Sequence, residues 1–299
     1  MEICPLHPKD YDALFAYWNQ LGKGIPYFFK VQQEKWIDCL LHDNLDGETL
    51  YQHSEVLIAW EKENVLGFVQ YGQPHLGFGA DGQTVLDPHI GNLRHLYFPA
   101  GRPEVGEALY AAAWQYLEEF EQVYAFYHIL GMSCNAYHGK LSSRMPHVES
   151  LLLAKGFRIQ HENIYYVLDS RIFDRGPQKS LHLHPSDIDN PHGKHRFVAI
   201  IKDPVKGNVE VGTAETRDLR FLTAGGTSEA VYLTWIGINE PYQGQGLGKL
   251  LIHSLADFFA EDGLVKMHSD TPRENTRAQG FYEKMGFIKK DVTRDYIKG

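Results

Sequence analysis

The segment AVYLTWIGI at Ala230–Ile238, followed by QGQGLG at Gln243–Gly248, decides the fold. Its first part is rich in β-branched and aromatic residues, which favour a strand. From the second part onward, apolar residues recur at helical spacing until Gly263 ends the pattern: Leu247, Leu250, Leu251, Leu255, Phe258 and Phe259. The sequence therefore predicts a strand, a glycine-rich turn and an amphipathic helix in direct succession.

Three glycines at alternate positions of this turn, Gly244, Gly246 and Gly248, suit it to an anionic ligand. Glycine has no Cβ, so the backbone can bend tightly and approach a ligand closely. The N–H groups of a first helical turn lack partners within the helix, and the helix dipole adds partial positive charge there. Residues 244–249 include no proline, so each can donate an N–H group, and Lys249 adds charge. This pattern is typical of a pyrophosphate site.

Other phosphate-binding loops share the glycines but fit less well. A nucleotide-hydrolysing loop continues Gly-Lys with Ser or Thr, whereas Leu250 follows Lys249 here. A dinucleotide fold places an acidic residue on a second strand about twenty residues onward, but Asp262 lies at the end of the predicted helix. A glycine turn without any ligand remains open on these residues alone.

A second pattern follows downstream, NTRAQGFYEKMGF at Asn275–Phe287. With the strand Thr234–Ile238 and the turn Gln243-x-x-Gly246-x-Gly248, it resembles the GNAT superfamily of N-acetyltransferases across Val231–Phe287. The resemblance implies a mixed α/β sheet whose fourth and fifth strands splay apart. It also implies that acetyl-coenzyme A, the acyl donor, lies in the gap.

The resemblance assigns residues to this cofactor. The pyrophosphate is expected on Gly244–Gly248, and the pantetheine is expected to pair like an added strand with the backbone of Ile236 and Ile238. Asn275 is expected to contact the cofactor's arm. The full expected cofactor-binding set is Ile236, Ile238, Gln243, Gly244, Gln245, Gly246, Leu247, Gly248, Lys249, Asn275 and Tyr282.

Acetyl transfer from a thioester to an amine has three chemical requirements. The amine must be neutral when it attacks, although an alkylammonium has a pKa near ~10. The oxyanion needs a donor, which by resemblance is the backbone N–H near Ile238. The departing thiolate benefits from a proton, and Tyr282 occupies the family's usual position for that acid. The alternative for Tyr282 is that it only packs.

The general base is the least determined group. Some relatives carry a glutamate eleven positions before the glutamine of the loop, where this chain has Tyr232. Period-two alternation predicts Tyr232 on one face with Thr234, Ile236 and Ile238. Glu229 is the carboxylate assigned as base through a water chain, with Glu215, Asp270 and ordered water as alternatives.

The N-terminal half repeats the order of the C-terminal half: strand, Pro, helix, strand, helix, Gly-Phe, strand. Pro99 and Gly156 correspond to Pro241 and Gly286, with an insertion expected within 125–144. The prediction is two tandem GNAT-like domains of the acyl-CoA N-acyltransferase type. They span 1–170 and 181–299 and are joined by a polar linker, 171–180, that contains Gly176-Pro177.

The first domain is expected to be degenerate. When Pro99 is aligned with Pro241, the first domain has Pro103 and Glu104 at positions that belong to the glycine turn in the second domain. Proline has no N–H to donate, and a carboxylate repels pyrophosphate. Leu152 falls on Tyr282, so the acid is missing. We therefore expect a non-catalytic domain that is structural or that shapes an acceptor pocket.

Composition bounds the remaining classes. With 299 residues and a net charge of −9, the chain does not suit nucleic acid, and the charge slightly favours a cationic amine acceptor. The three cysteines are widely separated, and no apolar run is long enough for a membrane span, so a cytoplasmic protein is expected. Four histidines lie close together in the sequence, but no Cys or carboxylate completes a tetrahedral zinc site with them: His182, His184, His192 and His195.

These patterns predict an acetyl-CoA-dependent N-acetyltransferase. It would transfer an acetyl group to a primary amine of a small molecule or peptide, by direct attack in a ternary complex. A monomer or homodimer without a metal is expected. The alternative is a non-catalytic acyl-CoA-binding or sensing protein.

Overall fold

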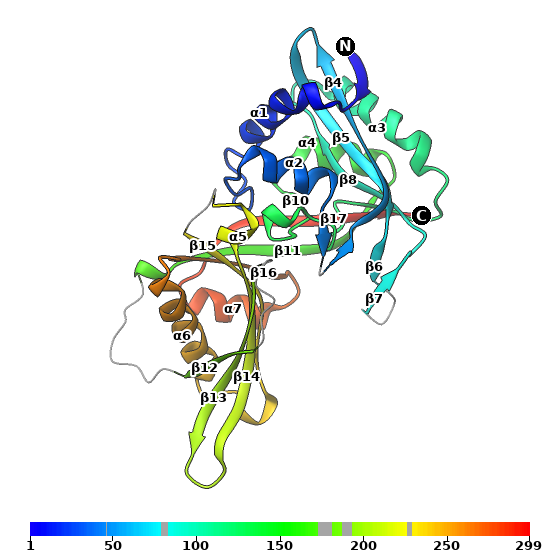
Figure 1. Cartoon of the computed structure of the whole chain (residues 1–299). Coiled ribbons are helices and arrows are strands. Elements are labelled where there is room, and N and C mark those ends of the chain that lie inside the picture. The colour runs from blue at the N-terminus through cyan, green and yellow to red at the C-terminus, as the bar shows by residue number, and fades with distance from the viewer. Residues whose placement is uncertain (46, 79–82, 173–180, 187–192, 226–228) are drawn as a thin grey trace. The chain divides into compact units, whose positions relative to one another are not determined.

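The computed structural model describes residues 1–299 except 46, 79–82, 173–180, 187–192 and 226–228 (Figure 1). The chain divides into two compact units. Unit 1 comprises Met1–Asn163 and Asp291–Gly299, and unit 2 comprises Ile164–Lys290. These ranges differ from the predicted domains in two ways: the break falls after Asn163, before the predicted linker, and the last residues of the chain belong to the first unit. Most of the predicted linker, 173–180, lies outside the described residues.

Unit 2 is a mixed sheet with the strand order β11-β16-β15-β14-β13-β12. Only β15 and β16 pair in parallel among the neighbours β12 to β16. The predicted strand and helix on either side of the glycine turn are both confirmed. The elements are part of β11 (Arg158–Asp169), β12 (His182–Ser186), β13 (Lys194–Asp203), β14 (Gly207–Asp218), α5 (Leu219–Leu222), β15 (Ala230–Ile238), α6 (Leu247–Glu261), β16 (Lys266–Pro272) and α7 (Thr276–Lys284).

Helix α6 covers one face of this sheet through its apolar stripe. The ring of Phe197 on β13 lies 5.0 Å from Phe258 and 5.7 Å from Phe259, measured between centroids. Leu251, Leu255 and Phe259 are fully or almost fully buried. Each such side chain contributes about 1.5–3 kcal/mol on burial, so the stripe fixes which face α6 occupies.

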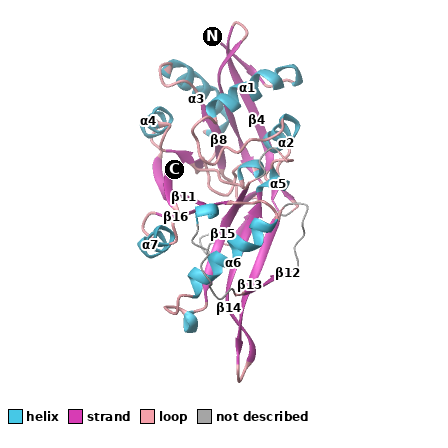
Figure 2. Ribbon diagram, turned by 90° about the vertical axis from the view of Figure 1, so that its left-hand side faces the viewer, coloured by secondary structure: helices cyan, strands magenta, loops and turns pink. Residues whose placement is uncertain are grey.

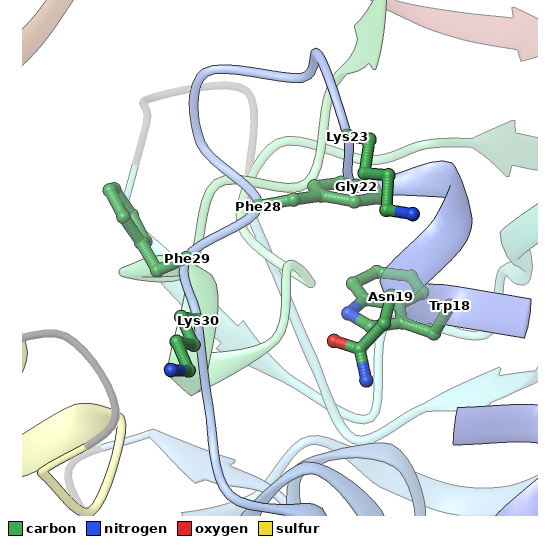
Figure 3. Close-up of a pocket in the computed structure, with 7 residues that line it drawn as sticks. All are labelled: Trp18, Asn19, Gly22, Lys23, Phe28, Phe29 and Lys30. Atoms are coloured by element: carbon green, nitrogen blue, oxygen red, sulfur yellow. The ribbon is translucent and has the colours of Figure 1, made fainter. Parts of the chain in front are cut away.

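Unit 1 has the strand order β1-β4-β5-β8-β9-β17-β11, with helices packed on the sheet (Figure 2). The main elements of unit 1 are β1 (Glu2–Pro5), α1 (Tyr11–Leu21), α2 (Gln33–Leu41), β4 (Tyr51–Glu61), β5 (Asn64–Pro74), β8 (Gly91–Tyr97), α3 (Pro103–Leu117), β9 (Val123–Ala125), β10 (Leu141–Ser142), α4 (Pro146–Ala154) and part of β17 (Ile288–Lys298). Among the described residues of both units, no helix has the length and apolarity needed to cross a bilayer.

The strand predicted after Gly286-Phe287 is one long strand, β17, that runs almost to the end of the chain. Residues 288–298 contain no Gly, Pro or Asn to make a turn, so the strand continues. Its second part completes unit 1, where Tyr296 pairs with Ala125. The fully buried Asp295 carboxylate lies 2.6 Å from His128 Nδ1 and accepts the His161 backbone N–H at 2.8 Å.

The two units share a local irregularity, which agrees with the predicted internal repeat. In β8, Leu93 lies opposite Tyr71 and His95 opposite Gln70, so Arg94 is an extra residue. In β15, Leu233 lies opposite Thr216 and Trp235 opposite Glu215, so Thr234 is extra. Both are β-bulges on the strand that precedes the central helix of its unit.

The bulge at Thr234 overturns the predicted alternation along β15. Antiparallel partners share a face, and Leu233, Ile236 and Ile238 lie opposite Thr216, Ala214 and Gly212. Those three partners stand at alternate positions of β14 and so point to one face of the sheet, which Leu233, Ile236 and Ile238 therefore share. Tyr232 therefore lies on the opposite face from Ile236 and Ile238, because the extra residue reverses the alternation.

Candidate functional site

Strands β15 and β16 form a fork. They pair only from Ala230–Tyr232 to Lys266–His268, and beyond Tyr232 the two strands part. The Asn239 N–H donates to Val211 O on β14, 2.9 Å away. Because N–H and C=O groups alternate in direction along a strand, Ile238 and Ile236 direct theirs toward the fork. Within the described residues, this edge of β15 pairs with no strand beyond Tyr232, and it borders the gap.

The glycine turn lies at the open end of β15. Gly244 and Gly246 adopt left-handed φ values of 76° and 78°, which favour glycine. A Cβ on Gly248 would lie 3.2 Å from the Phe281 ring of α7, so this position is restricted by close packing. In the described chain, N–H groups 244–248 donate to no backbone carbonyl, whereas Lys249 and Leu250 both donate to Gly246 O. Five consecutive donors are thus available to a ligand at the start of α6.

Two of the predicted cofactor residues, Gln243 and Asn275, have structural partners. Gln243 Nε2 donates to Ile238 O at 2.8 Å, and its Oε1 accepts from Arg277 at 2.8 Å. Asn275 caps α7 by accepting the Ala278 N–H at 3.0 Å. These bonds hold the end of β15 and the start of α7 in place. Sequence reasoning did not identify this role.

Tyr282 lies on α7 with 6% of its surface exposed. Its Oη is 3.1 Å from Ser269 Oγ, and Ser269 Oγ is 3.0 Å from Leu233 O, so the phenol lies beside β15. Burial raises the pKa of Tyr282, the Ser269 hydrogen bond lowers it, and the Asp270 charge raises it; the net shift is upward. The phenol therefore remains protonated at neutral pH and can donate a proton.

Asp270 and Tyr232 meet at the fork. The Tyr232 hydroxyl donates to Asp270 Oδ1 at 2.6 Å, and Asp270 stands two residues beyond the last parallel pair of β16. Burial raises the pKa of Tyr232 well above its usual value, with the Asp270 charge acting in the same direction. The phenol is thus a fixed neutral donor that orients the Asp270 carboxylate.

The structure does not bring Glu229 to this place. It precedes β15 at the closed end of the fork, with its carboxylate 3.5 Å from Lys266 Nζ. Nine residues separate it from Ile238, about 30 Å along an extended strand. Glu215, the other carboxylate considered, lies opposite Trp235, with Arg196 Nε 3.9 Å away.

The equivalent loop in unit 1 is shorter and begins its helix differently. It spans residues 98–102, against 239–246 in unit 2, and α3 starts at Pro103 where α6 starts at Leu247. Superposing the two helix starts puts Pro103 on Leu247, whereas laying Pro99 on Pro241 puts it two residues earlier, on Gln245. The Arg102 guanidinium is paired with Glu104 and with Glu61. On α4, Leu152 stands at the position of Tyr282 on α7.

Arg94, the bulge residue of unit 1, is buried within a polar network. Its guanidinium contacts Asp43 Oδ2 at 3.1 Å and donates to Leu130 O at 2.7 Å and Gly131 O at 3.2 Å. Its counterpart Thr234 is exposed. Sequence reasoning missed Arg94, although a lone arginine within the apolar strand GNLRHLY was a visible signal.

Comparison with known proteins agrees with this geometry. Residues 162–287 match the model of the acetyltransferase (GNAT) family. The chain is 31% identical over 75 residues to N-alpha-acetyltransferase 30 of Schizosaccharomyces pombe, which is 25% of this chain and 50% of that protein. The match thus spans half the length of that curated relative.

Solved structures share the fold along almost the whole chain. A tandem GNAT protein from the clavulanic acid biosynthesis pathway superposes with a TM-score of 0.63 at 11% identity, covering 99% of this chain and 98% of that one. A GCN5-related N-acetyltransferase from Sphaerobacter thermophilus gives 0.63 at 11% identity, covering 99% and 95%. The chain therefore has the fold of tandem GNAT proteins, and its segment 162–287 matches the acetyltransferase (GNAT) family model.

Proposed function

We propose that unit 2 is an acetyl-CoA-dependent N-acetyltransferase that acetylates a primary amine by direct attack in a ternary complex. The observation that carries the proposal is the row of free N–H groups at 244–248, placed beside the open fork of β15 and β16. A pyrophosphate on these donors would leave the thioester arm to enter the fork. The match of residues 162–287 to the acetyltransferase (GNAT) family model supports the same proposal.

The chain's own groups then supply the chemistry. The free edge of β15 at Ile236 and Ile238 pairs with the amide-bearing arm, and the Ile238 N–H donates to the oxyanion. The amine nitrogen attacks the thioester carbon, and the C–S bond breaks as the tetrahedral intermediate collapses. Tyr282 gives its proton to the departing thiolate. Lys249, on the first turn of α6, adds positive charge near the phosphates.

For the proton lost by the amine, the geometry favours Asp270 over Glu229. Asp270 lies in the fork and is oriented by Tyr232, whereas Glu229 is engaged with Lys266 at the closed end. We propose that Asp270 accepts this proton, directly or through one water. Unit 1 is proposed to be non-catalytic, because its loop before α3 lacks the row of glycines and its α4 has Leu152 where α7 has Tyr282.

Isothermal calorimetry with acetyl-CoA and a thiol-release assay over a panel of amines test the proposal together. Binding with turnover of at least one amine supports it. Binding with flat traces for every amine would favour the alternative, a non-catalytic acyl-CoA-binding or sensing protein. Absence of heat would overturn both.

Gly246→Ala is expected to weaken acetyl-CoA binding. An alanine at φ near 78° costs about 1–2 kcal/mol, so the turn relaxes and its N–H groups no longer converge, raising Kd roughly 5- to 30-fold. Gly263→Ala is the matched control, since Gly263 has φ 77° in open space at the far end of α6. Scanning calorimetry should show that the two variants lose similar amounts of folding stability. Titration calorimetry should show a raised Kd for acetyl-CoA only in Gly246→Ala. Equal Kd values in both variants would contradict the phosphate assignment.

Asp270→Asn is expected to lower kcat roughly 100-fold at pH 7, as loss of a general base does. The deficit should shrink near pH 10, because about half of the free amine is then neutral without help. The ratio of variant to wild-type kcat is measured across this pH range. Tyr232→Phe, which keeps the carboxylate but removes its donor, should show a smaller deficit. A constant ratio for Asp270→Asn would indicate that ordered water alone accepts the proton.

A further inference from the structure

The face of the sheet opposite α6 is where an acceptor can meet the fork. Ile238 lies on the α6 side, because its Cγ1 is 3.8 Å from the position of a Cβ on Gly248. The bulge at Thr234 places Trp235 on the other face. The glycine turn leads directly into α6, so the proposed cofactor site is on the α6 side of the sheet. The face opposite α6 is then available to the acceptor.

Trp235 is the most exposed aromatic side chain of the described residues, at 58%. A Cβ on Gly237 would lie 3.3 Å from the indole Nε1 and Cζ2, so the ring lies along the strand over a residue that has no side chain. This arrangement keeps one face of the indole open beside the fork. Tryptophan is enriched at binding interfaces, because its large ring offers apolar contact area together with an N–H donor.

Glu215 supplies a carboxylate next to this ring. It is the direct cross-strand partner of Trp235 and therefore shares its face. Arg196 approaches it at 3.9 Å, with both side chains substantially exposed, so the pair is long and screened and contributes little. Arg217 lies opposite Tyr232 farther along the face. Trp235 and Glu215 are thus the groups beside the fork that favour a cation.

We propose that Trp235 and Glu215 bind the acceptor in its ammonium form, before Asp270 takes the proton. This inference rests on the proposed function and names its substrate class as cationic primary amines. An ammonium over an indole face is attracted by the ring quadrupole, and a neighbouring carboxylate adds a Coulombic term. Neutral acceptors such as alcohols gain neither interaction.

A pair of non-reactive probes tests the recognition directly. Choline and 3,3-dimethyl-1-butanol have the same shape, but only choline carries a positive charge. We expect choline, and not the alcohol, to change the tryptophan fluorescence and to compete with an amine acceptor. Trp235→Phe should abolish the choline response, whereas the control Trp60→Phe in unit 1 should retain it. Equal responses to the two probes, or a response that survives in Trp235→Phe, would overturn the inference.

Kinetics with n-butylamine separate this inference from the proposed function. Trp235→Ala and Glu215→Gln should raise the KM for the amine roughly 3- to 30-fold, with unchanged KM for acetyl-CoA. Turnover with an amine KM that neither variant changes would refute the ammonium site and leave the acetyltransferase intact. Failure of the wild-type protein to bind acetyl-CoA would refute the proposed function instead, while the choline titration still decides whether Trp235 receives a cation.

Discussion

Tyr282→Phe is expected to lower kcat about 100-fold or more while the Kd for acetyl-CoA stays within about twofold. The change removes one oxygen and keeps the ring, so the packing against Tyr166, 5.5 Å away between centroids, is retained. The phenol is buried and its pKa is raised, so it is fully protonated at neutral pH and its loss leaves the thiolate without a donor. Steady-state kinetics and calorimetry measure the two quantities separately.

Tyr166→Phe is the matched control. Its hydroxyl lies 3.2 Å from Glu283 Oε1 and not beside Ser269, so kcat should be nearly unchanged. Equal losses in both variants would mean that Tyr282 acts only through packing. A protein with no turnover before or after Tyr282→Phe, but with intact acetyl-CoA affinity, would instead be the binding or sensing protein.

Removal of Asp291–Gly299 is expected to unfold unit 1. The deletion strips β9 and β10 of their partner strand and leaves buried groups exposed or unpaired. His128 and His161 would lose the buried Asp295 carboxylate that lies between them. Losing one partner of a buried charged pair alone costs about 3–5 kcal/mol, a large part of the stability of a domain.

Hydrogen exchange on the truncated protein measures this outcome. Amides of β8 and β9 should exchange freely, whereas those of β14 and β15, which lie in unit 2, should keep more of their protection. Ile288→Ser is the control, since this side chain is 53% exposed at the start of β17. Protection of β8 and β9 equal to that of the full chain would contradict the assignment of 291–299 to unit 1.

Local sequence signals predicted the centre of unit 2. The strand Ala230–Ile238 was bounded correctly, because its β-branched and aromatic run ends at a Pro-containing turn. The start of α6 followed from the glycines, whose positive φ values leave few alternatives. The equivalence of Leu152 and Tyr282 also holds, since each is seven positions into its helix.

Two features of the structure could not be predicted from the sequence, because each depends on how distant segments pair. The bulge at Thr234 follows from the register of β14 against β15, and no residue type announces it. The placement of β17 in unit 1 depends on the partners it meets after 290 residues of chain. Total charge was also uninformative about the acceptor: residues 164–290 contain 16 basic and 16 acidic residues, so the net −9 belongs to unit 1.

The buried Arg94 has a consequence for the history of the molecule. If the two units descend from one duplicated ancestor, inserting a tyrosine at 152 or glycines before α3 would not restore activity to the first. The guanidinium would also have to leave, and the buried Asp43 would then lose its ion-pair partner at a cost of about 3–5 kcal/mol. If unit 1 is non-catalytic as proposed, any return to activity that required the loss of Arg94 would therefore pass through a less stable protein.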